Sequence, residues 1–93
     1  MGRAKPSLPE VFLGARGRFR VLEILSECGE LNISEIARRA GMNYSSTEEH
    51  LEKLKKADLV KEKRYGKIRI FETTFATLNI RFEKGRGVKI ERM

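Results

Sequence analysis

The sequence predicts an α+β fold in which a bundle of three helices is followed by a β-hairpin. Apolar residues recur every three or four positions as far as residue 57, and beyond residue 58 they tend to alternate with polar ones. Gly29 and Gly41 follow the first two helical stretches, at positions where glycine commonly ends a helix. Two β-rich segments then meet at Gly66, which is typical of a hairpin turn.

The first predicted helix runs from residue 15 to Gly29. Its apolar positions are spaced by three and four and separated by charged ones, and they are Phe19, Val21, Leu22, Ile24, Leu25 and Cys28. Because Cys28 ends this apolar stripe, we expect it to be a small buried hydrophobic residue rather than a redox sensor. A single cysteine also excludes an intrachain disulfide.

Two shorter helices are expected next. A short strand at 31–33 leads to the second helix, for which Ser34 is a suitable N-cap and Glu35 suits the positive end of the helix dipole. After Gly41 we expect a third helix over 44–57, capped by Asn43. Its inner face would consist of Thr47, Leu51, Leu54 and Ala57, and Met42 before it would be a buried anchor.

The chain after residue 58 changes to a period of two. Segments 59–65 and 67–73 form the predicted hairpin. The tail at 74–93 fits either a second hairpin or a helix, and its threonines, which are poor helix formers, favour the hairpin. We therefore divide the chain into an N-terminal arm at 1–14, a main domain at 15–73 and a C-terminal extension at 74–93.

Charge indicates the class of partner. The 93 residues include 20 Lys and Arg against 13 Asp and Glu, a net charge of +7. Cationic side chains that neutralise phosphates release condensed counterions, so this balance favours a nucleic-acid partner. The sequence contains no apolar run of the roughly 18–20 residues that cross a membrane, and no secretory signal. We expect a single domain located in the cytoplasm.

No motif in this sequence indicates an enzyme activity. It contains no phosphate-binding loop, no nucleophile motif and no paired histidine and carboxylate set. One histidine and one cysteine make a zinc site within one chain improbable. We expect no enzyme activity, no cofactor and no small-molecule ligand.

Segment 34–51 carries the function. Two short helices joined by a tight turn need a small residue where they cross, supplied by Ala37, and a glycine in the turn, supplied by Gly41. This helix-turn-helix leaves the outer side of helix 44–57 exposed, and a helix fits the major groove of B-DNA. The residues expected to contact DNA here are Ser34, Arg38, Arg39, Asn43, Tyr44, Ser45, Ser46, Glu49, His50 and Lys53.

Three of these residues have competing interpretations. Glu49 could accept a hydrogen bond from cytosine or stabilise the helix dipole. Tyr44 could contact the DNA backbone or pack against Ile33 and the hairpin. For His50, a structural or phosphate-facing role is favoured over a pH sensor or a metal ligand.

The stretch from Ser34 to Val60 resembles the ArsR/MarR-type winged helix-turn-helix regulators. Segments 17–25, 29–37 and 63–71 are similar to compact archaeal regulators of this type. Those families have a Ser/Thr-rich start to the recognition helix, a His-Leu pair and a Leu-x-x-x-Gly-Leu-Val entry into the wing. Asp58 stands where they usually have glycine. The resemblance covers residues 15–73. It implies a sequence-specific transcriptional regulator that places helix 44–57 in the major groove. The paired cysteines of ArsR-type metal sensors are absent from this sequence, so metal sensing is not expected.

The predicted wing is basic around its turn. Lys63, Arg64, Lys67 and Arg69 are expected to contact phosphates or enter a minor groove. Alternatively, these cations protect an exposed edge strand from aggregation.

We expect a homodimer that reads a two-fold DNA site. Candidate dimer surfaces are the apolar arm at 11–13, the first helix and the tail hairpin. Two other functions stay open, an architectural DNA-binding protein without sequence preference and a winged-helix module for protein assembly.

Overall fold

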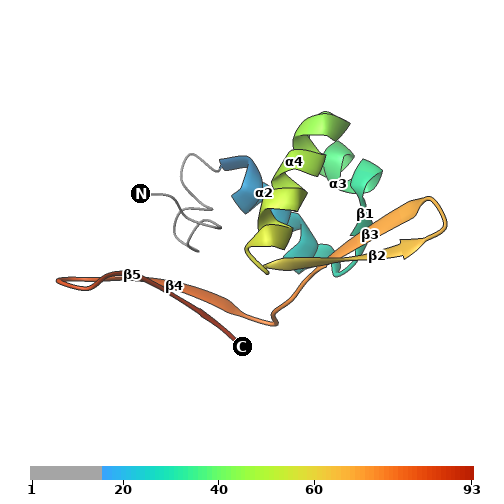
Figure 1. The fold of residues 1–93 in the computed structure, drawn as a ribbon. Helices are drawn as coiled ribbons and strands as arrows, with labels where there is room; N and C mark the ends of the chain where they lie inside the picture. Colours follow the sequence, from blue (N-terminus) through green and yellow to red (C-terminus); the bar gives the residue numbers. More distant parts are fainter. Residues whose placement is uncertain (1–15) are drawn as a thin grey trace, which may run out of the picture.

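The computed structural model describes residues 16–93, so the apolar arm at 11–13 lies outside the described part. The elements in chain order are α2 (Arg16–Cys28), β1 (Leu31–Asn32), α3 (Ile33–Ala40), α4 (Tyr44–Lys56), β2 (Val60–Tyr65), β3 (Ile68–Thr73), β4 (Leu78–Glu83) and β5 (Gly87–Arg92). Figure 1 shows the three helices gathered on the β2–β3 hairpin, with the β4–β5 hairpin extending away from them. No helix within residues 16–93 is long and apolar enough to cross a membrane.

The predicted fold class, three helices with a β-hairpin wing, is confirmed. The division of the chain at residues 14 and 73 stays a prediction.

The cap of α3 corrects the prediction for Ser34. The residue at the N-cap is Asn32, whose side-chain oxygen accepts a hydrogen bond from the backbone N–H of Glu35 at 2.8 Å. Ile33, expected to end the short strand, is instead the first helical residue and is buried. Because burying Ile33 starts the helix two residues earlier than predicted, Ser34 falls in its first turn, where it is exposed.

The cap of α4 is confirmed. The side-chain oxygen of Asn43 accepts a hydrogen bond from the backbone N–H of Ser46 at 2.7 Å. The helix ends at Lys56, and Ala57, expected to be its last residue, is the C-cap. Met42 is half-buried at the edge of the core rather than fully buried as expected.

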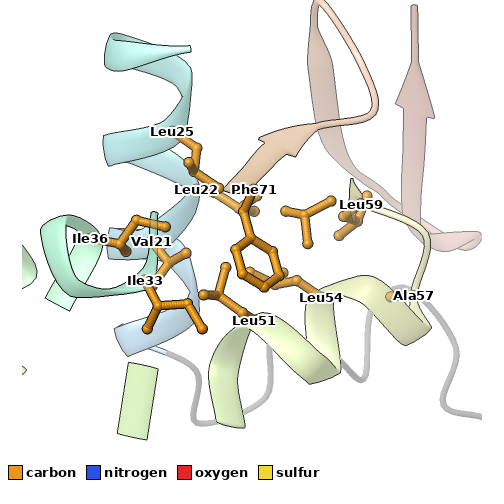
Figure 2. Close-up of a cluster of buried hydrophobic side chains, with 11 residues drawn as sticks. Val21, Leu22, Leu25, Ile33, Ile36, Leu51, Leu54, Ala57, Leu59 and Phe71 are labelled. Carbon is orange, nitrogen blue, oxygen red and sulfur yellow. The ribbon is translucent and has the colours of Figure 1, made fainter. Parts of the chain in front are cut away.

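The core lies between the helices and β3. Figure 2 shows Phe71 of β3 lying among side chains of α2 and α4, including Leu22, Leu51 and Leu54. Phe71, Leu51 and Leu54 are all fully buried. Burying side chains of this size stabilises the fold by about 1.5–3 kcal/mol each. The wing is therefore attached to the helices through the strand that carries Phe71.

The buried face of α2 contains four of the predicted positions, Val21, Leu22, Ile24 and Leu25. It differs at the start of the helix, where Arg18 is only 8% exposed whereas Phe19 is 46% exposed. Arg18 lies three and four positions before Val21 and Leu22, on the same face of the helix. Cys28, the last residue of the helix, was expected to be buried and is exposed. Its Sγ accepts a hydrogen bond from Nη1 of Arg39 at 2.9 Å.

The main sheet has the strand order β1-β3-β2, all antiparallel. In the wing, Tyr65 pairs with Ile68, so the turn consists of Gly66 and Lys67. At the entry to the wing, Asp58 adopts a φ of +61°, a conformation that glycine adopts at least cost and aspartate tolerates. This explains how aspartate stands where similar sequences have glycine.

The tail forms the second hairpin and not the alternative helix. Strands β4 and β5 pair antiparallel from Leu78 opposite Arg92 to Glu83 opposite Gly87. Glycines at 85 and 87 both have positive φ and allow the turn. The period-two pattern thus prevailed over the helical spacing of Phe75, Leu78 and Phe82.

Candidate nucleic-acid interface

The outer face of α4 is exposed to solvent. Thr47, Leu51 and Leu54 are buried against the core, and the hydroxyl of Thr47 donates to the carbonyl of Asn43 at 2.9 Å. A helix buried along one stripe presents its opposite stripe to solvent. The exposed residues of α4 include Tyr44, Ser45, Ser46, Glu49, Lys53 and Lys56. Lys56 was not among the expected contacts, although its exposed position seven residues after Glu49 follows from helical periodicity.

Asn43 lies at the start of this face, and the oxygen of its side chain is already engaged in a hydrogen bond. Its amide oxygen caps α4 through Ser46. The side-chain NH₂ group is therefore what Asn43 can offer to a partner.

His50 lies between α4 and α2 rather than on the outer face. A Cβ atom built on Gly17 would come within 2.4 Å of its Nε2, so the imidazole occupies the space that this glycine leaves. The Nδ1 atom is buried with no hydrogen-bond partner among the described residues. Burial, together with the positive charge of Arg18, lowers the pKa of His50 below its usual value. This geometry favours the structural interpretation of His50.

The arginines of α3 share one carboxylate. Nε of Arg39 lies 3.0 Å from Oε2 of Glu35, and Arg38 also pairs with that oxygen. Their hydrogen bonds hold the pKa of Glu35 below its usual value. The Arg38 side chain is 70% exposed, against 43% for Arg39, so Arg38 is the more accessible of the two.

Most cations of the wing have partners within the protein. Lys63 Nζ lies 3.0 Å from Glu30 and 3.1 Å from Glu72, and Arg64 Nε lies 3.0 Å from Glu62. Lys67, in the turn, forms no ion pair with any residue in the 16–93 range. Glu30 could not be identified from the sequence as a partner of the wing, because only the fold brings it to Lys63.

Arg69 departs most from its expected position. Its guanidinium lies 2.7 Å from Glu62, 2.5 Å from Glu48 and 3.5 Å from Glu52, and its side chain is only 15% exposed. The guanidinium carbon also lies 5.4 Å from the centre of the Phe71 ring. We call Arg69 with these three glutamates the Arg69 cluster. It joins the wing to α4, and Arg69 is therefore not on the exposed surface where we expected it.

The electrostatics of the Arg69 cluster are strong. The hydrogen bond from Arg69, with others from Lys55 and Arg64, lowers the pKa of Glu62 to about 2. Sequence reasoning did not identify Glu48 and Glu52 as partners of Arg69. A usable signal was the spacing of Glu48 and Glu52, since residues four apart lie on one face of a helix and two like charges there need a cation.

A shallow hollow lies between the starts of α3 and α4 and the turn of the wing. It has a volume of about 210 Å³ and its lining includes Ser34, Tyr44, Lys67 and Arg69. The fold thus brings four of the expected contacts to one place, and three of them, Ser34, Tyr44 and Lys67, are not part of the Arg69 cluster. The hydroxyls and the ammonium of these residues are groups that commonly bind phosphate oxygens.

Comparison with known proteins is consistent with this arrangement. A family model described as "Bacterial regulatory protein, arsR family" matches residues 16–62. Among solved structures, a possible transcriptional regulatory protein from Mycobacterium bovis is 29% identical, with a TM-score of 0.62 over 70% of this chain and 67% of its own. Rv0081 of M. tuberculosis is 28% identical, with a TM-score of 0.61 over the same shares. A third structure is described as the homodimeric winged helix-turn-helix DNA-binding domain of a possible ArsR-family regulator from M. bovis. It is 27% identical, with a TM-score of 0.58 over 81% of this chain and 77% of its own. No curated protein sequence matches the chain.

Proposed function

Because this chain belongs to the ArsR family of bacterial regulatory proteins, we propose that it is a transcriptional regulator that binds double-stranded DNA in a sequence-specific manner. The observation that carries the proposal is the exposed face of α4, which belongs to the segment that the family model matches. It lies beside Lys67 of the wing, which forms no ion pair with the described residues. A solved relative with the same fold is described as a DNA-binding domain.

The proposed contacts fall into two groups. Ser45, Ser46, Glu49 and Lys53 enter the major groove on α4, because they lie on its exposed face. The residues that contact the backbone are Ser34, Arg38, Arg39, Asn43, Tyr44, Lys63, Arg64 and Lys67, and contacts of this kind fix the register of the protein on the duplex. His50 and Arg69 were also expected to contact DNA; in the structure the ring of His50 lies against Gly17 of α2, and Arg69 pairs with Glu48 of α4.

The DNA-binding form is proposed to be a homodimer, as the M. bovis relative is described to be. Two copies related by a two-fold axis would read two half-sites about 34–36 Å apart, one turn of the duplex. We further propose that the protein acts in the cytoplasm and does so without catalysis. No group of three or more potential metal ligands occurs within residues 16–93.

The proposal is tested by selecting bound duplexes from a random DNA pool at physiological salt. A recovered motif with two-fold symmetry is the expected result. Retention of DNA without a motif would instead identify an architectural protein, whose binding follows salt and length only. No retention even at low salt would exclude DNA as the partner and favour a protein-assembly module.

A further inference from the structure

The β4–β5 hairpin has one apolar and one polar face. Its register places Ile80 opposite Ile90 and Phe82 opposite Val88, so these side chains share one face with Leu78. Phe82 is 82% exposed and Val88 is 37% exposed. Residues 16–93 of a single protomer therefore leave much of this apolar face in water.

The opposite face suits water. It carries Asn79, Arg81, Glu83, Lys89 and Glu91. Across the two strands, Arg81 pairs with Glu91 at 3.2 Å. The hairpin therefore has the composition of a sheet that is covered on one side, with one apolar face and one polar face.

The hairpin is attached to the rest of the described protein at its base. There Arg92 contacts Asp58, and the hydroxyl of Thr74 donates to the carbonyl of Asp58 at 2.7 Å. Leu78 and Phe75 pack at the edge of the core. Beyond this base the strands extend away from the helices, as Figure 1 shows. A two-stranded hairpin alone is marginally stable in water, so an apolar face of this size needs a cover.

From these features we propose that the β4–β5 hairpin is the dimer interface of this protein, with its apolar face packed on the same face of a second copy. The proposal rests on the homodimeric regulator proposed above. A surface of leucine, isoleucine, valine and phenylalanine is complementary to itself, as a two-fold contact demands. Its one cationic side chain, Arg92, is already held by Asp58. A nucleic acid or an acidic partner would therefore find no unpaired cation on this face.

The position of the hairpin is compatible with DNA binding. The turn of the wing and the turn of the β4–β5 hairpin point to opposite sides of the molecule (Figure 1). Packing two copies through the hairpin leaves the outer face of α4 and Lys67 uncovered. The competing surface on α2 is more polar, because Phe19 lies there among Arg16, Arg20 and Glu23.

The dimer is tested by sedimentation equilibrium of the full chain and of two matched variants. Phe82→Glu places a carboxylate on the apolar face, and Lys89→Glu places the same side chain on the polar face, opposite Arg81. Since Phe82 is 82% exposed, its replacement should leave the protomer folded, which circular dichroism checks. Each dimer loses two copies of the phenylalanine, so we expect Phe82→Glu to weaken dimerisation about 100-fold or more. Lys89→Glu should keep the wild-type dimer although it changes the net charge more.

The outcomes separate this inference from the proposed function. If the Phe82→Glu variant stays as dimeric as the wild type, the interface lies elsewhere and only the hairpin proposal fails. A wild-type chain that is monomeric at micromolar concentration overturns both the interface and the proposed dimer. Failure to retain DNA would overturn the DNA-binding function, while the sedimentation result would still decide the interface. Added salt distinguishes DNA binding from dimerisation. It weakens DNA binding, because it weakens phosphate contacts, whereas it favours dimerisation, because it screens the repulsion between two chains of charge +7.

Discussion

Arg69 and Glu62 form the most enclosed ion pair of the wing, with Nε and Oε2 2.7 Å apart and side chains 15% and 6% exposed. The same guanidinium reaches Glu48 of α4 at 2.5 Å. The wing and α4 are thus joined by charge as well as by the packing of Phe71. The contacts of Arg69 with Glu48 and Glu52 fix the position of the wing relative to α4, on which the proposed DNA contacts depend.

Glu62→Gln should destabilise the fold. The variant removes the carboxylate that accepts from Arg69, Lys55 and Arg64, and it leaves Arg69 poorly compensated in a partly buried position. We expect the free energy of unfolding to fall by about 2 kcal/mol, as measured by urea denaturation. Lys67→Gln, in the turn, is the control and should change stability by less than about 0.5 kcal/mol. Equal stability of the two variants would show that the Arg69 cluster is not a structural element.

Acid should remove the contribution of Glu62 in a defined range of pH. Its pKa is about 2 in the folded state against an ordinary value of 4.5. A carboxyl with a lowered pKa stabilises the fold above its ordinary pKa, and this contribution is lost as the pH falls from 4.5 toward 2. Urea denaturation at several pH values should therefore show a steeper loss for the wild type than for Glu62→Gln. Parallel curves would contradict the low pKa.

Lys67→Ala and Arg69→Ala should affect DNA binding differently. Lys67 has no ion pair within the described part of the chain, so its loss should weaken binding to all sequences and reduce the salt slope by about one. Arg69 is already paired with glutamates, and its loss should weaken binding with little change in the slope. Affinities measured from about 50 to 200 mM salt test both expectations. A reduced slope for Arg69→Ala would place this arginine on a phosphate.

Asn43 has a capping role that can be separated from DNA contact. Asn43→Ala removes the acceptor for the N–H of Ser46 and should cost about 1 kcal/mol of stability. Asn43→Ser keeps a capping oxygen and should recover most of that loss in thermal unfolding. If alanine and serine are equally stable, the cap contributes nothing measurable.

Ser45→Ala should change the preference among DNA sites without changing stability, because the side chain is exposed on the outer face of α4. Repeating the selection from random DNA with this variant measures the preference. Uniform weakening over all sites would mean that Ser45 contacts only the DNA backbone.

Gly17 and His50 should be energetically coupled. An alanine Cβ at position 17 would lie 2.4 Å from Nε2 of His50, so the imidazole must move. In a His50→Ala background the same Gly17→Ala change meets no ring and gains helix propensity. A double-mutant cycle should give a coupling of about 1 kcal/mol or more in stability, with Gly17→Ala more favourable when the ring is absent. Additive effects would mean that the two residues do not touch in solution.

The sequence by itself determined the order and type of the elements. Apolar spacing identified the three helices, and alternation identified both hairpins, because these periods follow from backbone geometry alone. It also determined the cap at Asn43, which depends only on residues next to it in the chain. The cap of α3 was assigned to Ser34 instead of Asn32, since the choice between neighbouring capping residues depends on whether Ile33 is buried.

Tertiary structure decided which side chains of the site are available. The sequence shows a basic wing, but the fold brings Glu30 to Lys63 and brings Glu48 and Glu52 to Arg69, leaving Lys67 unpaired within residues 16–93. Ion pairs between residues 17 to 33 positions apart leave no periodic signal, because they form only after the elements pack. Likewise, the sequence showed an apolar alternation in the tail, and only the structure showed that the apolar face of the second hairpin is left uncovered in a single protomer.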